Sequence, residues 1–153
     1  LELAGARGVT LFNRFYQPDI DLEALDVDRK LVLSTSRELP MRLHALAILS
    51  PTTELSLACT GGAHSGLDAA KAILCGADVV QLASVLLERG PAHLGVLHAE
   101  LASWFDEKRY ASSNEARGIL ALGSTPDPHA WERVQYMKLL DSWQPPNVGK
   151  RSR

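Results

Sequence analysis

The run from Glu54 to Glu88 constrains the fold more than any other stretch, because it predicts two strands joined by one helix. A short apolar run that contains Cys59 stops at Gly61-Gly62, and a β-branched run at Val79-Val80 stops at Ala83-Ser84. Two strands joined by a single helix run parallel, so both of their carboxyl ends open on the same edge of the sheet. The two small-residue turns are therefore expected to lie side by side.

The connecting helix has predicted start and stop signals of its own. Ser65 is the expected N-cap, apolar residues follow at helical spacing, and Gly76 is expected just after the helix. Small residues and exposed backbone N–H groups beside a helix N-terminus form a receptor for an anion such as a phosphate. The alternative interpretation is a tight strand-to-helix turn with no ligand.

The flanking segments extend the same alternation of strands and helices. A strand is expected at Val9–Phe12 and ends in the polar residues Asn13 and Arg14, whereas 20–37 is predicted to be an excursion with a short strand at Leu31–Leu33. Helices are expected at 38–49 and from Pro91 to Lys108, the second with a leucine stripe predicted to be core. Shorter helices are expected after Ser112 and after Pro126.

This order predicts an α/β protein with a parallel sheet. A doubly wound sheet is one possibility, but two consecutive small-residue strand ends fit the phosphate site near the end of a (β/α)8 barrel. Such barrels typically need about 250 residues, and this chain has 153. We therefore predict the C-terminal half of a (β/α)8 barrel over residues 1–110, with a helical extension and tail over 111–153.

Composition excludes several classes of protein. The net charge of −2 comes from dispersed charges and argues against a nucleic-acid partner, and the basic tail around Arg151 is interpreted as a frayed end. No apolar run is long enough to predict a membrane span, and no signal-peptide pattern opens the chain. Cys59 and Cys75 lack metal-site spacing and are expected to be reduced thiols in a cytoplasmic protein.

Three blocks carry a resemblance to a known family: Cys59–Gly62, Ala72–Ala77 and Asp78–Ser84. They resemble the C-terminal part of dihydroorotate dehydrogenases, most closely the bacterial dihydroorotate dehydrogenase-like branch. The resemblance extends through 8–16, 104–118 and 126–137, and it covers about the last half of a family member. It implies a (β/α)8 barrel that binds FMN and oxidises the small molecule dihydroorotate to orotate in pyrimidine biosynthesis.

The resemblance also implies site residues. Gly61, Gly62, Ala83 and Ser84 would hold the FMN phosphate, and Asn13 would face the substrate ring. The family's general base and its flavin-contacting lysine belong to the first half of the barrel, so the catalytic residue is unknown and this chain alone is expected to be inactive. No metal site is expected.

The sequence departs from the family at several positions and leaves alternatives open. Arg14 stands where a small hydroxyl residue is usual, and Ala83 where glycine is frequent; Arg14 could pair with a substrate carboxylate, or with Asp19 or Asp21 in its own loop. His64 could approach the phosphate or cap a helix. The chain could also be a phosphate-binding barrel isomerase or synthase, or a non-catalytic half-barrel that forms a homodimer or recruits its missing half.

Overall fold

The computed structural model describes residues 1–14 and 17–131. The helix expected after Pro126 is described only as far as Trp131, where it forms a 3-10 turn. The rest of that helix, the tail around Arg151 and the remainder of the predicted extension lie outside the described residues. The elements that build the body are β1 (Gly8–Leu11), α1 (Leu39–Leu49), β4 (Ser56–Thr60), α2 (Gly66–Leu74), β5 (Val79–Gln81), α3 (Ser84–Arg89), α4 (His93–Lys108) and α5 (Ser113–Ala116). Short 3-10 turns occur at Glu2–Ala4, Ser36–Glu38, Ser50–Thr52 and Pro128–Trp131.

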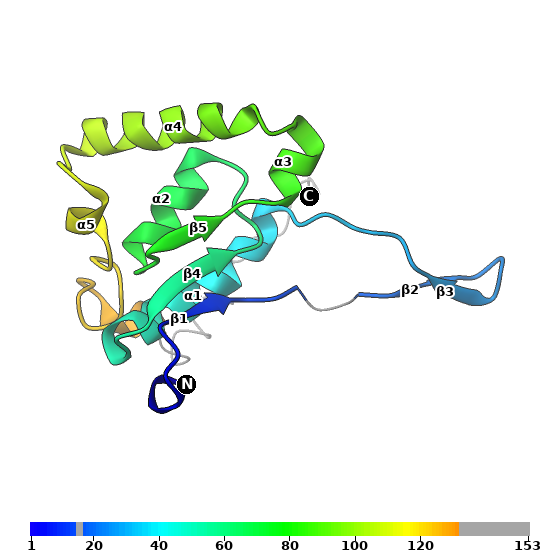
Figure 1. Cartoon of the computed structure of the whole chain (residues 1–153), viewed down its shortest axis with the longest axis horizontal. Coiled ribbons are helices and arrows are strands. Elements are labelled where there is room, and N and C mark those ends of the chain that lie inside the picture. The colour runs from blue at the N-terminus through cyan, green and yellow to red at the C-terminus, as the bar shows by residue number, and fades with distance from the viewer. Residues whose placement is uncertain (15–16, 132–153) are drawn as a thin grey trace, which may run out of the picture.

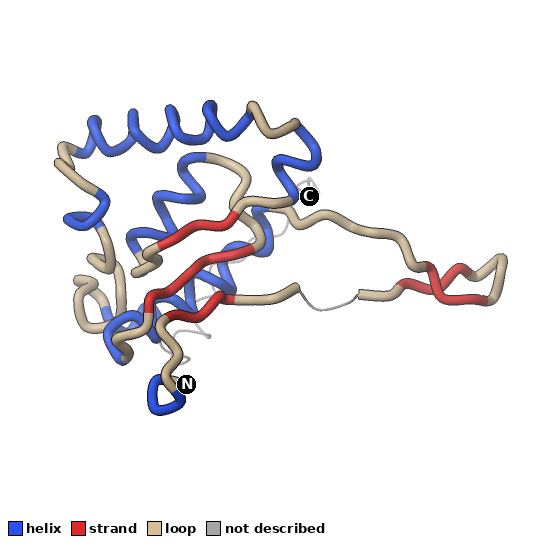
Figure 2. The backbone as a smooth tube through the Cα atoms, in the orientation of Figure 1, coloured by secondary structure: helices blue, strands red, loops and turns tan. Residues whose placement is uncertain are grey.

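The sheet of the body has three parallel strands in the order β1-β4-β5. Thr10 of β1 lies opposite Ala58 of β4, and Cys59 of β4 lies opposite Val80 of β5. Figures 1 and 2 show the strands side by side with all of their carboxyl ends at one edge. The predicted βαβ unit is therefore confirmed, including the expected start and end of its helix. The Ser65 hydroxyl accepts the Asp68 N–H, and Gly76 has φ +106°.

Among the described residues, helices cover one face of this sheet and leave the other open. The alternate residues Leu11, Leu57 and Cys59 are buried in a core with Leu46 of α1 and Ala72 of α2. On the opposite face the strand side chains are exposed or half-buried; they are those of Thr10, Ser56, Ala58, Thr60, Val79 and Gln81. A doubly wound sheet would carry helices on both faces, whereas a barrel keeps them outside. The described chain thus has the parallel α/β fold of part of a (β/α)8 barrel, without closure.

The excursion differs from its prediction. The expected strand at Leu31–Leu33 is wrong; instead β2 (Asp19–Asp21) and β3 (Asp26–Asp28) form an antiparallel hairpin that projects from the body (Figure 1). The Asp21 carboxylate accepts the N–H groups of Glu23 and Ala24, which fixes the connecting turn. The alternation of aspartates with Ile20 and Val27 was a period-two strand signal that the sequence interpretation overlooked.

The helix after β5 also corrects an expectation. α4 forms as predicted, but it packs on α2 instead of lying wholly in the core, so only Leu97 of its stripe is buried and Leu94 is 51% exposed. The short helix α3, which begins directly at Ser84, was not predicted. In the described part of the chain, no helix has the length and apolar character needed to cross a bilayer.

Candidate functional site

A cavity of about 190 Å³ lies at the carboxyl edge of the sheet. Every residue that the sequence assigned to binding lines it: Asn13 beyond β1, Gly61 and Gly62 after β4, and Ala83 and Ser84 after β5. The other lining residues are Phe12, Arg14, Ser34, Thr60, Ala63 and Gln81. The strand order thus brings together residues that are up to 71 positions apart between Asn13 and Ser84.

The glycine turn after β4 requires glycine for steric reasons. Gly61 and Gly62 have φ of +80° and +89°, a region that side chains with a Cβ rarely adopt. A Cβ on Gly62 would lie 2.5 Å from the Leu39 backbone nitrogen and 2.9 Å from its Cα. The start of α1 therefore packs directly against this turn, and the backbone at Gly62 is fixed from behind.

Ser34 is a site residue that the sequence interpretation missed. It is 4% exposed and lies in the segment between the hairpin and α1. Its hydroxyl accepts the Gly62 N–H at 3.3 Å and donates to the Ser84 hydroxyl at 2.8 Å, and the Ser84 hydroxyl accepts the Ser34 N–H at 3.0 Å. Neither periodicity nor a motif marks Ser34 in the sequence, so the pairing of strand ends alone did not reveal it.

His64 contacts the cluster formed by the Ser34 and Ser84 hydroxyls from outside the cavity. Its Nε2 lies 3.4 Å from the Ser34 hydroxyl, and its Nδ1 lies 4.0 Å from a Glu88 carboxylate oxygen. His64 does not itself line the cavity. His64 thus contacts Ser34 next to the cavity. The sequence interpretation had considered contact with the phosphate or capping of a helix.

Asp68 fixes the segments on either side of the cluster. It is 4% exposed and accepts hydrogen bonds from the Ser36 hydroxyl at 2.8 Å and from the His64 N–H at 3.1 Å. Burial opposes ionisation of this carboxyl, but these two hydrogen bonds together with Lys71 outweigh it and hold the pKa of Asp68 below its usual value. The Ser34–Ser36 segment and the start of α2 are therefore tied to one charged group.

A pair of arginines shares one carboxylate beside the glycine turn. Arg14 donates to Glu38 at 3.0 Å, so it pairs with neither Asp19 nor Asp21 in this structure. Arg42 is 3% exposed, lies 3.6 Å from the same carboxylate, and donates to the Thr60 carbonyl at 3.2 Å and the Glu38 carbonyl at 2.9 Å. Within the described part of the chain, the buried Nε of Arg14 has no hydrogen-bond partner.

The two thiols are structural. Cys59 and Cys75 are free and buried in the core, as expected for Cys59 from its strand position. Burial raises the pKa of Cys59 to about 11, with Arg42 opposing the shift, and burial together with Cys59 raises that of Cys75 to about 12. Both remain protonated near neutral pH, which is unlike a reactive thiol. Among the described residues, no cluster of three or more potential metal ligands is present.

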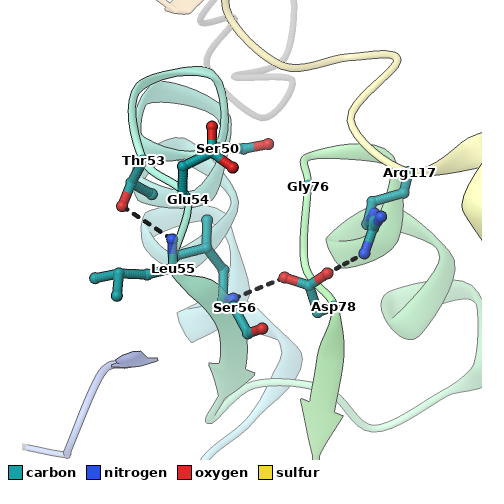
Figure 3. A pocket seen from close by; sticks show the side chains of 9 residues that line it. Ser50, Thr53, Glu54, Leu55, Ser56, Gly76, Asp78 and Arg117 are labelled. Atoms are coloured by element: carbon teal, nitrogen blue, oxygen red, sulfur yellow. Dashed lines mark hydrogen bonds and ion pairs between the residues drawn. The ribbon is translucent and has the colours of Figure 1, made fainter. Parts of the chain in front are cut away.

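A second cavity, of about 240 Å³, lies at the opposite edge of the sheet (Figure 3). Two of its charged residues pair with each other: Asp78 pairs with Arg117, and it also accepts the Leu57 N–H at 2.8 Å. In barrels of this kind, residues at the amino-terminal face of the sheet usually contribute to stability, whereas catalysis occurs at the carboxyl-terminal face. We interpret this cavity as a structural junction between β4, β5 and the segment after α5.

Replacing Asp78 by alanine is therefore expected to lower the free energy of unfolding by about 1–2 kcal/mol, because the Leu57 N–H loses its acceptor. Arg117→Ala removes only a half-exposed ion pair and should cost less than about 1 kcal/mol. Urea titrations followed by circular dichroism measure both changes. A loss of ligand binding at the carboxyl edge in either variant would contradict the structural role.

Comparisons with known proteins agree with this geometry, although no family model matches the sequence. The chain is 44% identical over 61 residues to a protein of Streptococcus pyogenes serotype M5 (strain Manfredo) named "putative dihydroorotate dehydrogenase A (fumarate)". That match covers 40% of this chain and 20% of the relative. This chain is also 40% identical over 62 residues to an isopentenyl-diphosphate delta-isomerase of Chlorobium phaeovibrioides (strain DSM 265 / 1930). That match covers 40% of this chain and 17% of the isomerase.

Solved structures show the same fold. A crystal structure of ligand-free DHODH from Eimeria tenella matches with a TM-score of 0.62 and 23% identity, over 77% of this chain and 33% of that one. The chain thus spans about a fifth of the curated relative and a third of the matched structure. These similarities support a dihydroorotate dehydrogenase-like family, as the resemblance of the glycine turn and its neighbours predicted.

Proposed function

We propose that this chain supplies the FMN-phosphate end of an oxidoreductase of the dihydroorotate dehydrogenase class, which oxidises dihydroorotate to orotate in pyrimidine biosynthesis. One observation carries the proposal: the Gly62 N–H and the hydroxyls of Ser34 and Ser84 converge on one point at the carboxyl edge of a parallel sheet. The Ser34 hydroxyl oxygen accepts the Gly62 N–H, which is a donor of the kind that binds phosphate oxygens. The cytoplasmic location expected from the free thiols is part of the same proposal.

The residues present fit the phosphate end of FMN. Gly61 and Gly62 hold the turn in a left-handed conformation at the cavity wall, and the turn cannot move away because Leu39 lies behind it. Ser84 adds a hydroxyl to the cavity wall. When bound, FMN would supply the hydride acceptor for the oxidation.

The chain's own residues bind and orient in this proposal. The Asn13 amide can both donate to and accept from the polar edge of a planar substrate. The described residues that line the cavity include no carboxylate, imidazole or thiol, so the group that removes a proton has to come from elsewhere in the protein. We therefore expect the 153-residue chain by itself to show no turnover.

Flavin binding tests the proposal directly. The full-length protein containing this chain is expected to purify with yellow FMN absorbance, and Gly62→Asp should abolish it, because the new side chain would collide with the Leu39 backbone and displace the glycine turn. Gly95→Asp is the matched control, because it adds the same charge at an exposed helix position with nothing within 4 Å. A colourless wild-type protein that takes up no FMN in equilibrium dialysis would refute the proposal.

A second candidate, a barrel isomerase acting on a phosphorylated metabolite, is favoured by the similarity to an isopentenyl-diphosphate delta-isomerase. The phosphate-type cluster alone does not separate the two functions. Binding of orotate against binding of isopentenyl diphosphate, measured by calorimetry on the same protein, distinguishes them. Tight binding of the diphosphate with no orotate binding would favour the isomerase.

The open sheet supports a proposal about partners. In the described part of the chain, β1 and β5 each have an unpaired edge, and one sheet face lacks a covering layer. Such edges and faces favour association, so we propose that the chain forms a homodimer or binds the missing part of the barrel. Sedimentation that finds a stable monomer of the isolated chain would contradict this.

A further inference from the structure

We infer that Arg14 determines substrate specificity by binding an anionic group of the substrate, a carboxylate or a phosphate, at the β1 end of the cavity. The inference deepens the proposed function and rests on it. The family resemblance does not suggest it, since a small hydroxyl residue is usual at this position. It follows from the charge, the geometry and the position of this side chain.

The first argument is charge. Of the described residues that line the cavity, Arg14 alone is charged. Its partner Glu38 is shared with Arg42, so two guanidinium groups face one carboxylate. This leaves an excess of positive charge at the cavity wall, which favours an anion.

The second argument is the state of the Arg14 guanidinium. One of its nitrogens donates to Glu38 at 3.0 Å, which fixes the direction of the planar group. Its Nε is buried and has no hydrogen-bond partner among the described residues. The side chain as a whole is 29% exposed and lines the cavity, so the remaining donors of its planar fork suit the oxygens of a carboxylate or phosphate there. The orientation of the side chain is already fixed before a ligand binds.

The third argument is position. Arg14 follows β1, whereas the Ser84 hydroxyl cluster follows β5, and β4 lies between these strands. Two strand spacings place the ends of β1 and β5 about 10 Å apart. Asn13 and Arg14 are adjacent in the chain and both line the cavity at the β1 end, so the anion at Arg14 belongs to the substrate that Asn13 would face.

Calorimetric titration of the full-length protein with orotate and with isopentenyl diphosphate tests the inference and distinguishes its two sources of anion. Arg14→Gln is expected to weaken binding of one of these ligands about 10- to 100-fold and to leave FMN binding unchanged. Arg14→Lys should lose less, because it keeps the charge but not the fork. Arg37→Gln, at an exposed arginine outside the cavity, is the matched control and should change neither ligand.

The outcomes separate this inference from the proposed function. Unchanged binding of both ligands in Arg14→Gln, an equal loss in Arg37→Gln, or no binding of either ligand to the wild-type protein would overturn the role of Arg14. A wild-type protein that binds no FMN would overturn the proposed flavin function. The same titrations would then still decide whether Arg14 binds an anion.

Discussion

Gly62→Ala is expected to lower the free energy of unfolding by about 2–4 kcal/mol and to abolish FMN binding by the full-length protein. Two costs add. Gly62 has φ +89°, which an alanine adopts only under strain, and its Cβ would lie 2.5 Å from the Leu39 nitrogen. That neighbour is backbone at the start of α1, so it cannot rotate out of the way. Either the turn, which lines the cavity, or the start of α1 behind it has to move.

Gly95→Ala is the control for this change. Gly95 lies within α4, and a Cβ at this position would have no neighbouring atom within 4 Å. Alanine there should therefore stabilise the protein by up to about 1 kcal/mol through its higher helix propensity. Urea unfolding measures both variants, and FMN titration measures the ligand. If Gly62→Ala unfolded at the wild-type urea concentration and still bound FMN, the glycine turn would not be the fixed anion receptor proposed here.

The part of the site that the sequence predicted is the part determined by chain direction. Parallel strands joined by helices have their carboxyl ends at one edge, so the turns after β4 and β5 had to meet, and the structure confirms that they do. Asn13 was expected at the same edge because a third strand precedes it. For these residues, local strand and helix signals were sufficient to predict proximity, because parallel strands in one sheet place the residues that follow them at the same edge.

The part that escaped prediction depends on tertiary contacts. Ser34 enters the cluster because Asp68 holds Ser36, 32 positions away from it in the chain, and this fixes the segment over the cavity. Neither residue shows a pattern of its own. The Leu94 side chain was expected in the core, but α4 rests on α2 and leaves it half-exposed. Periodicity identified the helix without showing which face has a neighbour.

Arg42 illustrates the same limit, since a charged residue within an amphipathic helix is usually predicted to face solvent. Here its guanidinium is buried beneath the glycine turn, and a Cβ on Gly61 would lie 3.1 Å from one of its nitrogens. It satisfies two backbone carbonyls, those of Thr60 and Glu38, at the end of β4 and the start of α1. The turn proposed to bind the ligand thus packs on an arginine that the sequence interpretation did not identify.

Arg42→Met is therefore expected to cost about 3 kcal/mol of stability and to weaken FMN binding, although methionine retains much of the buried length. The Thr60 and Glu38 carbonyls would lose their donors in a buried site, and Glu38 would keep Arg14 as its remaining charged partner. This remaining pair limits the cost to the lower end of the range for breaking a buried ion pair. Arg37→Met, at an exposed position, should change the free energy of unfolding by less than about 0.5 kcal/mol.

Urea unfolding and FMN titration of these two arginine variants separate support of the turn from a general effect of charge. Because Arg42 contacts the turn from below and does not line the cavity, its loss should act through the position of Gly61 and Gly62. Lysine at position 42 keeps the charge but cannot reach both carbonyls with a rigid fork, so it should restore little. Full recovery of stability and FMN binding in Arg42→Lys would show that charge, and not the paired hydrogen bonds, supports the turn.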